Sequence, residues 1–200
     1  TIAPDNVRAW INLGTAYQQV QRIPEAKAAY AKALEISPEQ AEVANNLGVL
    51  AKDEESWEEA LRYFEQAATL QPLRADIMNN RALALSVLGE HLTALNILTQ
   101  SLQTEDNARS KRLFYRIVKH LRLERCPVFL RDALVRALSE PWGRPNELAR
   151  ICSDLVKLSP DIGGCVARAV GAWPVRLSAQ DLFGSNGLTP LAADPLLCVL

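Results

Sequence analysis

Asparagine residues recur along the first half of the chain at a fixed spacing of 34 residues, at Asn12, Asn46 and Asn80. Asn45 and Asn79 directly precede the second and third of them. A side-chain amide carries both hydrogen-bond donors and an acceptor, so it can pair with the backbone of an extended peptide whatever the peptide's sequence. The spacing therefore predicts a peptide-binding surface, provided that the residues in between bring the amides into line.

Residues that carry catalysis or bind metals are few in this chain. The two histidines, His91 and His120, have no metal-ligand partner at helical spacing. The sequence contains no nucleophile elbow, dinucleotide-binding loop or phosphate-binding Gly-Lys-Ser/Thr segment. The four cysteines lack the close spacings of zinc and redox motifs, since they stand at Cys126, Cys152, Cys165 and Cys198. We therefore expect a non-catalytic chain with no cofactor and no metal site.

The elements that position the asparagines follow from the rest of the 34-residue period. Apolar residues at the i, i+3, i+4 and i+7 spacing of a helix begin the period, and Pro24 suits the first turn of a second helix. The recurring residues are Leu13, Gly14, Tyr17, Ala26, Tyr30, Ala33 and Pro38, which one period later are Leu47, Gly48, Ala51, Ala60, Phe64, Ala67 and Pro72. Together with Trp10 this series resembles the tetratricopeptide repeat, a helix-turn-helix unit.

The resemblance is strong for residues 7–74 and fades over 75–108, where Arg81 replaces a leucine and Asp106 the closing proline. It implies an all-α fold, a right-handed alpha solenoid of about three helical hairpins over 7–40, 41–74 and 75–108. In the first hairpin we expect helices over 7–20 and 24–36. Ser56 and Glu59 predict a capping box before the second helix of the next hairpin. Gly89 is placed to end the first helix of the third hairpin before a helix over 91–102.

The resemblance also implies that the first helix of each hairpin lines a concave groove, along which the asparagines form a ladder. The ladder is similar to that in the repeats of protein O-linked N-acetylglucosamine transferases. The expected peptide-binding residues are Asn12, Asn46, Asn80, Asn79, Asn45, Thr15, Gln18, Val49, Lys52 and Leu83. Two interpretations stay open. Either the asparagines bind a peptide backbone, or they are present only because asparagine is common at this place of the repeat, without any ligand. A carboxylate clamp would need cations here, and only Arg8 and Lys52 are candidates.

The two halves of the chain differ in charge and in pattern. Residues 1–106 hold 8 Lys and Arg against 15 Asp and Glu, whereas residues 107–200 hold 14 against 8. Residues 1–6 are expected to be the end of a truncated preceding repeat. We expect a basic amphipathic capping helix over residues 109–125. For residues 126–200 we expect a proline-punctuated helical region of about four or five short helices, which is truncated. The apolar stripe of the capping helix comprises Leu113, Phe114, Ile117, Val118 and Leu121.

These patterns indicate a module that binds a protein or peptide partner, and they do not indicate a nucleic-acid partner. We expect no membrane segment, because no apolar run approaches the ~20 residues that span a bilayer. Unpaired cysteines indicate buried thiols in a reducing, cytoplasmic compartment, and we expect a bacterial source. Exposed repeat ends predict self-association.

An alternative function comes from a second resemblance. The stretches 141–145, 188–191 and 194–197 look somewhat like the region that follows the repeats in some bacterial methyltransferases that use S-adenosylmethionine. The chain would then be the substrate-recruiting or regulatory region of a larger bacterial transferase, that methyltransferase or an O-GlcNAc-transferase-like glycosyltransferase, whose catalytic domain is missing here.

Overall fold

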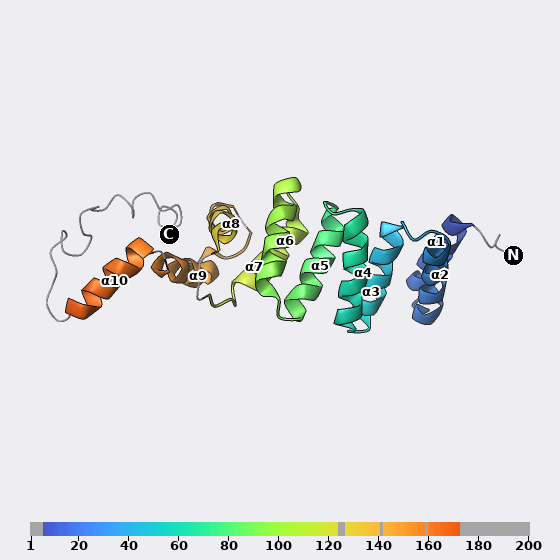
Figure 1. Ribbon diagram of the computed structural model, residues 1–200, viewed down its shortest axis with the longest axis horizontal. Helices are drawn as coiled ribbons and strands as arrows, with labels where there is room; N and C mark the ends of the chain where they lie inside the picture. The colour runs from blue at the N-terminus through green and yellow to red at the C-terminus, as the bar shows by residue number, and fades with distance from the viewer. Residues whose placement is uncertain (1–5, 124–126, 141, 159, 173–200) are drawn as a thin grey trace. The chain divides into compact units, whose positions relative to one another are not determined.

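The computed structural model describes residues 6–123, 127–140, 142–158 and 160–172. In these ranges every regular element is an α-helix, which confirms the predicted all-α class (Figure 1). The chain divides into two compact units, residues 1–110 and residues 111–200. One helix, α7 (Ala108–Val118), contains the point of division.

Three helical hairpins make up most of the first unit. Each consists of two helices joined by a short turn, and consecutive helices pack side by side from α1 to α6 (Figure 1). The helices are α1 (Val7–Gln19), α2 (Ile23–Ile36), α3 (Ala41–Asp53), α4 (Trp57–Leu70), α5 (Ala75–Val87) and α6 (His91–Thr104). The helices predicted over 7–20, 24–36 and 91–102 are therefore confirmed to within two residues at each end.

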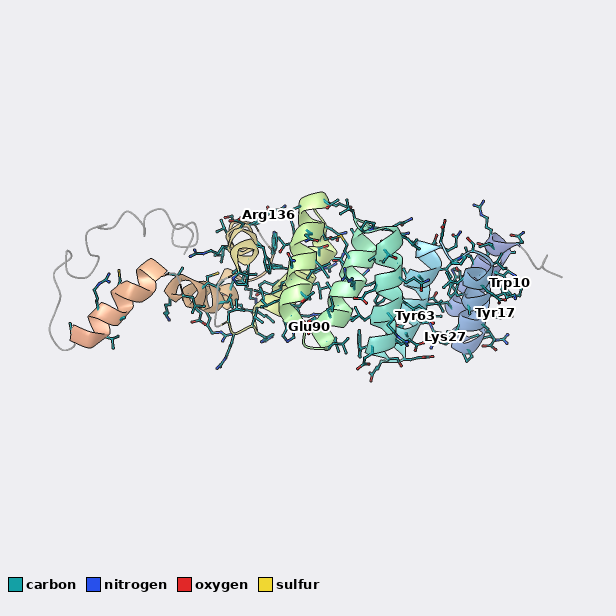
Figure 2. The ribbon with its side chains drawn as sticks, in the orientation of Figure 1. Trp10, Tyr17, Lys27, Tyr63, Glu90 and Arg136 are labelled. Atoms are coloured by element: carbon teal, nitrogen blue, oxygen red, sulfur yellow. The ribbon has the colours of Figure 1, made fainter. Side chains whose placement is uncertain are left out.

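Glycine sets the distance between the two helices of a hairpin. A Cβ atom built on Gly14 in α1 would lie 2.6 Å from Cδ1 of the Tyr30 ring in α2. One repeat later, a Cβ atom on Gly48 would lie 2.5 Å from Cε1 of Phe64. Both rings are fully buried, so the glycines leave room for a large side chain that fills the space between the helices. Figure 2 shows Trp10 and Tyr17 on α1, which pack against the core that contains Tyr30.

The turn inside each hairpin has one repeated geometry. Gln21, Glu55 and Gly89 stand 34 residues apart, and all three adopt a left-handed backbone with φ of 60°, 59° and 90°. The residue after each donates its N–H to the carbonyl five residues earlier, as Glu90 does to Leu85 at 2.8 Å. This is the Schellman motif that ends a helix. The predicted role of Gly89 is thereby confirmed.

The predicted capping box at the start of α4 is wrong. Ser56 is the N-cap residue, but its side chain makes no capping hydrogen bond. The backbone N–H of Ser56 donates instead to the carbonyl of Ala51 at 2.9 Å, as part of the preceding turn. The N–H of Ser56 is therefore not available to donate to the Glu59 side chain. The start of the helix is set by the turn before it.

In the second unit, α7 is followed by α8 (Val128–Ser139), α9 (Pro145–Lys157) and α10 (Pro160–Ala172). α7 is shorter than the expected segment 109–125, because a tight turn follows Val118, with the N–H of Leu121 bonded to its carbonyl. The predicted apolar stripe of α7 is buried at Leu113, Phe114, Ile117 and Val118. The stretches 188–191 and 194–197 lie outside the described residues.

The turn between α8 and α9 is held by Glu140 and Trp142. Glu140 accepts hydrogen bonds from Lys111 Nζ at 2.8 Å, Arg136 Nε at 2.7 Å and Trp142 Nε1 at 2.6 Å. The hydrogen bond from Lys111 contributes most, followed by those from Trp142 and Arg136, and together they lower the pKa of Glu140 to about 2. The Trp142 ring meets Phe114 edge-on, with centroids 5.4 Å apart. This turn is therefore anchored to both α7 and α8.

Candidate functional site

The three rungs of the asparagine ladder lie in three different environments. Asn12 in α1 is exposed, Asn46 in α3 is half-buried, and Asn80 in α5 is only 4% exposed. The amides at the same place of each repeat thus become less accessible from the first repeat to the third. The first two rungs are the ones whose amide atoms can reach a ligand.

Asn80 is occupied by contacts inside the protein. Its Nδ2 donates to Asn45 Oδ1 at 2.9 Å, and its Oδ1 accepts from Arg109 of α7 at 2.8 Å. The neighbouring Asn79 is 1% exposed and accepts a hydrogen bond from Ser110 Oγ at 2.9 Å. These hydrogen bonds link α3, α5 and the first turn of α7, and they satisfy polar atoms that burial removes from water. Among the described residues, Nδ2 of Asn79 has no partner.

A second polar cluster surrounds the hydroxyl group of Tyr30. Tyr30 Oη donates to Gln18 Oε1 at 3.1 Å and accepts from Asn46 Nδ2 at 3.4 Å. It also lies 3.1 Å from Thr15 Oγ1, which donates to the carbonyl of Ile11. One hydroxyl on α2 therefore fixes three side chains that the sequence predicts as peptide-binding residues, two from α1 and one from α3.

The surroundings of Tyr30 also affect its acidity. Burial raises the pKa of the Tyr30 hydroxyl, its side-chain contacts with Thr15 and Asn46 lower the pKa, and the negative charge of Glu42 raises it further. The hydroxyl is therefore protonated at neutral pH and has a proton to donate. Glu42 precedes Asn46 by one helical turn, so the two side chains lie on one face of α3.

The other predicted contacts continue the same face of the first helices. Val49, Lys52 and Leu83 are half-buried, and Lys52 Nζ lies 2.7 Å from Asp53 Oδ1. Arg8 is exposed at the start of α1. We call this face the A-helix surface, and it comprises Asn12, Thr15, Gln18, Glu42, Asn46, Val49, Lys52 and Leu83.

Sequence reasoning missed Tyr30, Glu42, Arg109 and Ser110 as parts of these clusters. Tyr30 carried a signal, because the same place in the next repeats is Phe64 and Leu98, which lack a hydroxyl group. Arg109 and Ser110 carried none, since they lie after the last repeat. Their role depends on how α7 begins: Asn107 Oδ1 accepts from the backbone N–H of Arg109 at 2.8 Å.

The described residues contain no group of three His, Cys, Asp or Glu side chains that could hold a metal ion. None of the described helices is long and apolar enough to cross a membrane. Cys152 is buried and unpaired, and burial raises the pKa of its thiol to about 11. Cys165 is also free and partly exposed, and Cys126 and Cys198 lie outside the described residues.

Hairpins of equal length, repeated glycine-aromatic contacts and a repeated turn define the first unit as a helical-hairpin repeat protein. Two family models, both described as tetratricopeptide repeat, match residues 5–72 and 45–109. Residues 5–109 therefore belong to the tetratricopeptide repeat family. None of the curated proteins matches the chain.

Solved structures share this fold at low sequence identity. A crystal structure of MamA is 20% identical with a TM-score of 0.55, covering 58% of this chain and 68% of that one. The first tetratricopeptide repeat domain of Spaghetti (RPAP3), bound to the HSP90 peptide SRMEEVD, is 16% identical with a TM-score of 0.54 and coverages of 58% and 93%. The O-GlcNAc transferase of Thermobaculum terrenum is 18% identical with a TM-score of 0.56, covering 70% of this chain and 27% of that one.

Proposed function

We propose that the first unit is a protein-interaction module that binds an extended peptide segment on the A-helix surface. The observation that carries the proposal is the set of hydrogen bonds around Tyr30 Oη. They hold side chains of two successive repeats, Gln18 and Asn46, in fixed orientations at half-exposed positions. A peptide then meets polar groups that are already ordered, which lowers the entropy cost of binding.

The orientation of the two amides suits a peptide backbone. Since Asn46 Nδ2 donates to Tyr30, its Oδ1 is left to accept from a peptide N–H. Since Gln18 Oε1 accepts from Tyr30, its Nε2 is left to donate to a peptide carbonyl. Asn12 adds an exposed amide on the same surface. Asn45, Asn79 and Asn80 are buried, so they support the same site by linking α3, α5 and the first turn of α7 rather than by contacting the peptide.

The family of the repeats supports the same proposal. The Spaghetti domain, which shares the fold, was solved with a peptide bound. The alternative function, as a recruiting or regulatory region of a larger bacterial transferase, stays a prediction, as do the cytoplasmic location and self-association through the repeat ends. An interaction module is compatible with a place in a larger transferase, because the A-helix surface would then recruit the substrate.

The proposal is tested with ten-residue peptides selected from a random phage-display library on the 200-residue chain. Affinity for a selected, fluorescein-labelled peptide is measured by fluorescence anisotropy. We expect Asn12→Ala combined with Asn46→Ala to weaken binding by about tenfold, because each lost hydrogen bond contributes ~1 kcal/mol or less.

The matched control is Asn96→Ala, which removes an exposed asparagine from α6, away from the A-helix surface. Asn80→Ala is unsuitable as a binding test, because it leaves buried Asn45 unpaired and removes a contact of Arg109. Failure to select any peptide, or equal affinities for the double variant and the control, would show that the surface does not bind peptides.

A further inference from the structure

One acidic group on the A-helix surface is not neutralised. Glu42 is exposed, and among the described residues no hydrogen bond or ion pair engages its carboxylate. The residue at the same place one repeat later, Asp76, accepts two hydrogen bonds from Arg74 at 2.8 and 3.0 Å. The equivalent residue one repeat earlier is a cation, Arg8. Of these three places, only the second offers an unpaired carboxylate.

The neighbours of Glu42 add hydrogen-bond acceptors. Asn46, one turn further along α3, directs its Nδ2 to Tyr30 and so leaves Oδ1 as an acceptor beside the carboxylate. The negative charge of Glu42 also contributes to the raised pKa of the Tyr30 hydroxyl. A carboxylate and an amide oxygen on one helix face are suited to a group with several N–H donors and a positive charge.

The charge of the surrounding unit points the same way. With 8 Lys and Arg against 15 Asp and Glu, residues 1–106 carry a formal charge of −7. Such a field attracts cationic segments and repels acidic ones during encounter.

We propose that Glu42 and Asn46 form a subsite of the A-helix surface for a lysine or arginine side chain of the bound peptide. The partner segment is therefore basic, with its cation on Glu42 and Asn46 and the adjacent backbone on Gln18. This inference rests on the proposed peptide binding and adds the chemistry of the partner.

The test uses the same random ten-residue phage library on three proteins: the wild type, Glu42→Gln and Glu39→Gln. Glu39 is an exposed glutamate of the loop between α2 and α3, so its replacement changes the net charge equally but leaves the subsite intact. We expect peptides selected on the wild type and on Glu39→Gln to be enriched in Lys or Arg at one position, and those selected on Glu42→Gln to lose this enrichment.

A second measurement uses one selected peptide and its variant in which the enriched cation is replaced by methionine. Fluorescence anisotropy should show about a fivefold preference of the wild type for the cationic peptide, as for an exposed ion pair, and almost no preference in Glu42→Gln. Peptides that bind without such a preference, or a preference that persists in Glu42→Gln, would overturn the subsite but leave peptide binding standing. Absence of any selected peptide would overturn both.

Discussion

Tyr30 combines two roles in one side chain. Its ring fills the space that Gly14 leaves between α1 and α2, and its hydroxyl orients Gln18 and Asn46. In the next repeat, Phe64 fills the same space over Gly48 but has no hydroxyl group. The amides oriented by a tyrosine hydroxyl therefore lie between the first and second repeats, which is why the proposed binding site is centred there.

The left-handed backbone of the turn residues affects stability. Glu55 adopts φ of 59°, a conformation that costs a residue with a side chain ~1 kcal/mol but costs glycine little. We expect Glu55→Gly to raise the free energy of unfolding by about 1 kcal/mol, measured by urea denaturation with circular dichroism. Gly89→Ala, at the equivalent place with φ of 90°, should lower it by a similar amount. A destabilised Glu55→Gly would mean that this backbone is not strained.

The helices are held together by two different means. Within the repeats, consecutive helices pack through apolar residues at fixed places, such as Ala26 and Tyr30 against Val43 and Leu47. In the second unit, the turn after α8 is fixed by polar contacts of Glu140 with Lys111 on α7 and Arg136 on α8. A cluster of charged contacts therefore helps to fix α7 against α8.

The Glu140 carboxylate makes the stability of the second unit depend on pH. Its pKa is about 2 in the folded protein against an ordinary 4.5, so the folded state favours the carboxylate. The stabilisation is fully present above about pH 4.5 and is lost as the pH falls toward 2. We expect Glu140→Gln to be less stable than the wild type at pH 7 and the difference to shrink on acidification, measured as urea midpoints at several pH values.

Asp154→Asn is the control for Glu140→Gln, because Asp154 forms only a 3.9 Å surface pair with Lys157 in α9. It should change the midpoints little. A difference between wild type and Glu140→Gln that stays constant from pH 7 to pH 2 would contradict the assigned role of the carboxylate.

The chain consists of two units that differ in charge, and the 34-residue repeats lie in the first of them. Residues 1–110 contain the three hairpins, and residues 111–200 contain most of α7 and all of α8 to α10. In a repeat array each hairpin is stabilised by its immediate neighbours, so a local defect spreads through the array. A defect in the repeats should therefore loosen the first unit before the second.

Gly48→Ala tests this independence. Its Cβ atom would overlap the buried Phe64 ring, which costs about 1–3 kcal/mol. Hydrogen exchange followed by mass spectrometry should show faster exchange in α1 to α6 and unchanged exchange in α8 and α9. Gly171→Ala is the control, since nothing lies within 4 Å of a Cβ atom there. Equal acceleration in both units would show that the chain unfolds as one body.

The hairpins of the first unit could be predicted from the sequence alone. The signals were the 34-residue period, the glycines that leave room for large side chains, and the apolar residues at helical spacing. They act through contacts that recur from repeat to repeat, so a single sequence is enough to detect them. Gly14, Tyr30 and Gly89 occupy the structural roles that their places predict. The failed capping box at Ser56 shows the limit, because the competing hydrogen bond comes from the preceding turn.

The exposure and hydrogen bonds of the asparagines could not be predicted from the sequence, because they depend on tertiary contacts. Asn12, Asn46 and Asn80 share one residue type and one place in the repeat, yet the first is exposed and the last is buried. The difference comes from neighbours that do not repeat: Tyr30 beside Asn46, and Asn45 and Arg109 beside Asn80. A periodic pattern fixes which face of a helix a residue occupies, whereas its exposure and hydrogen bonds depend on the side chains packed opposite it.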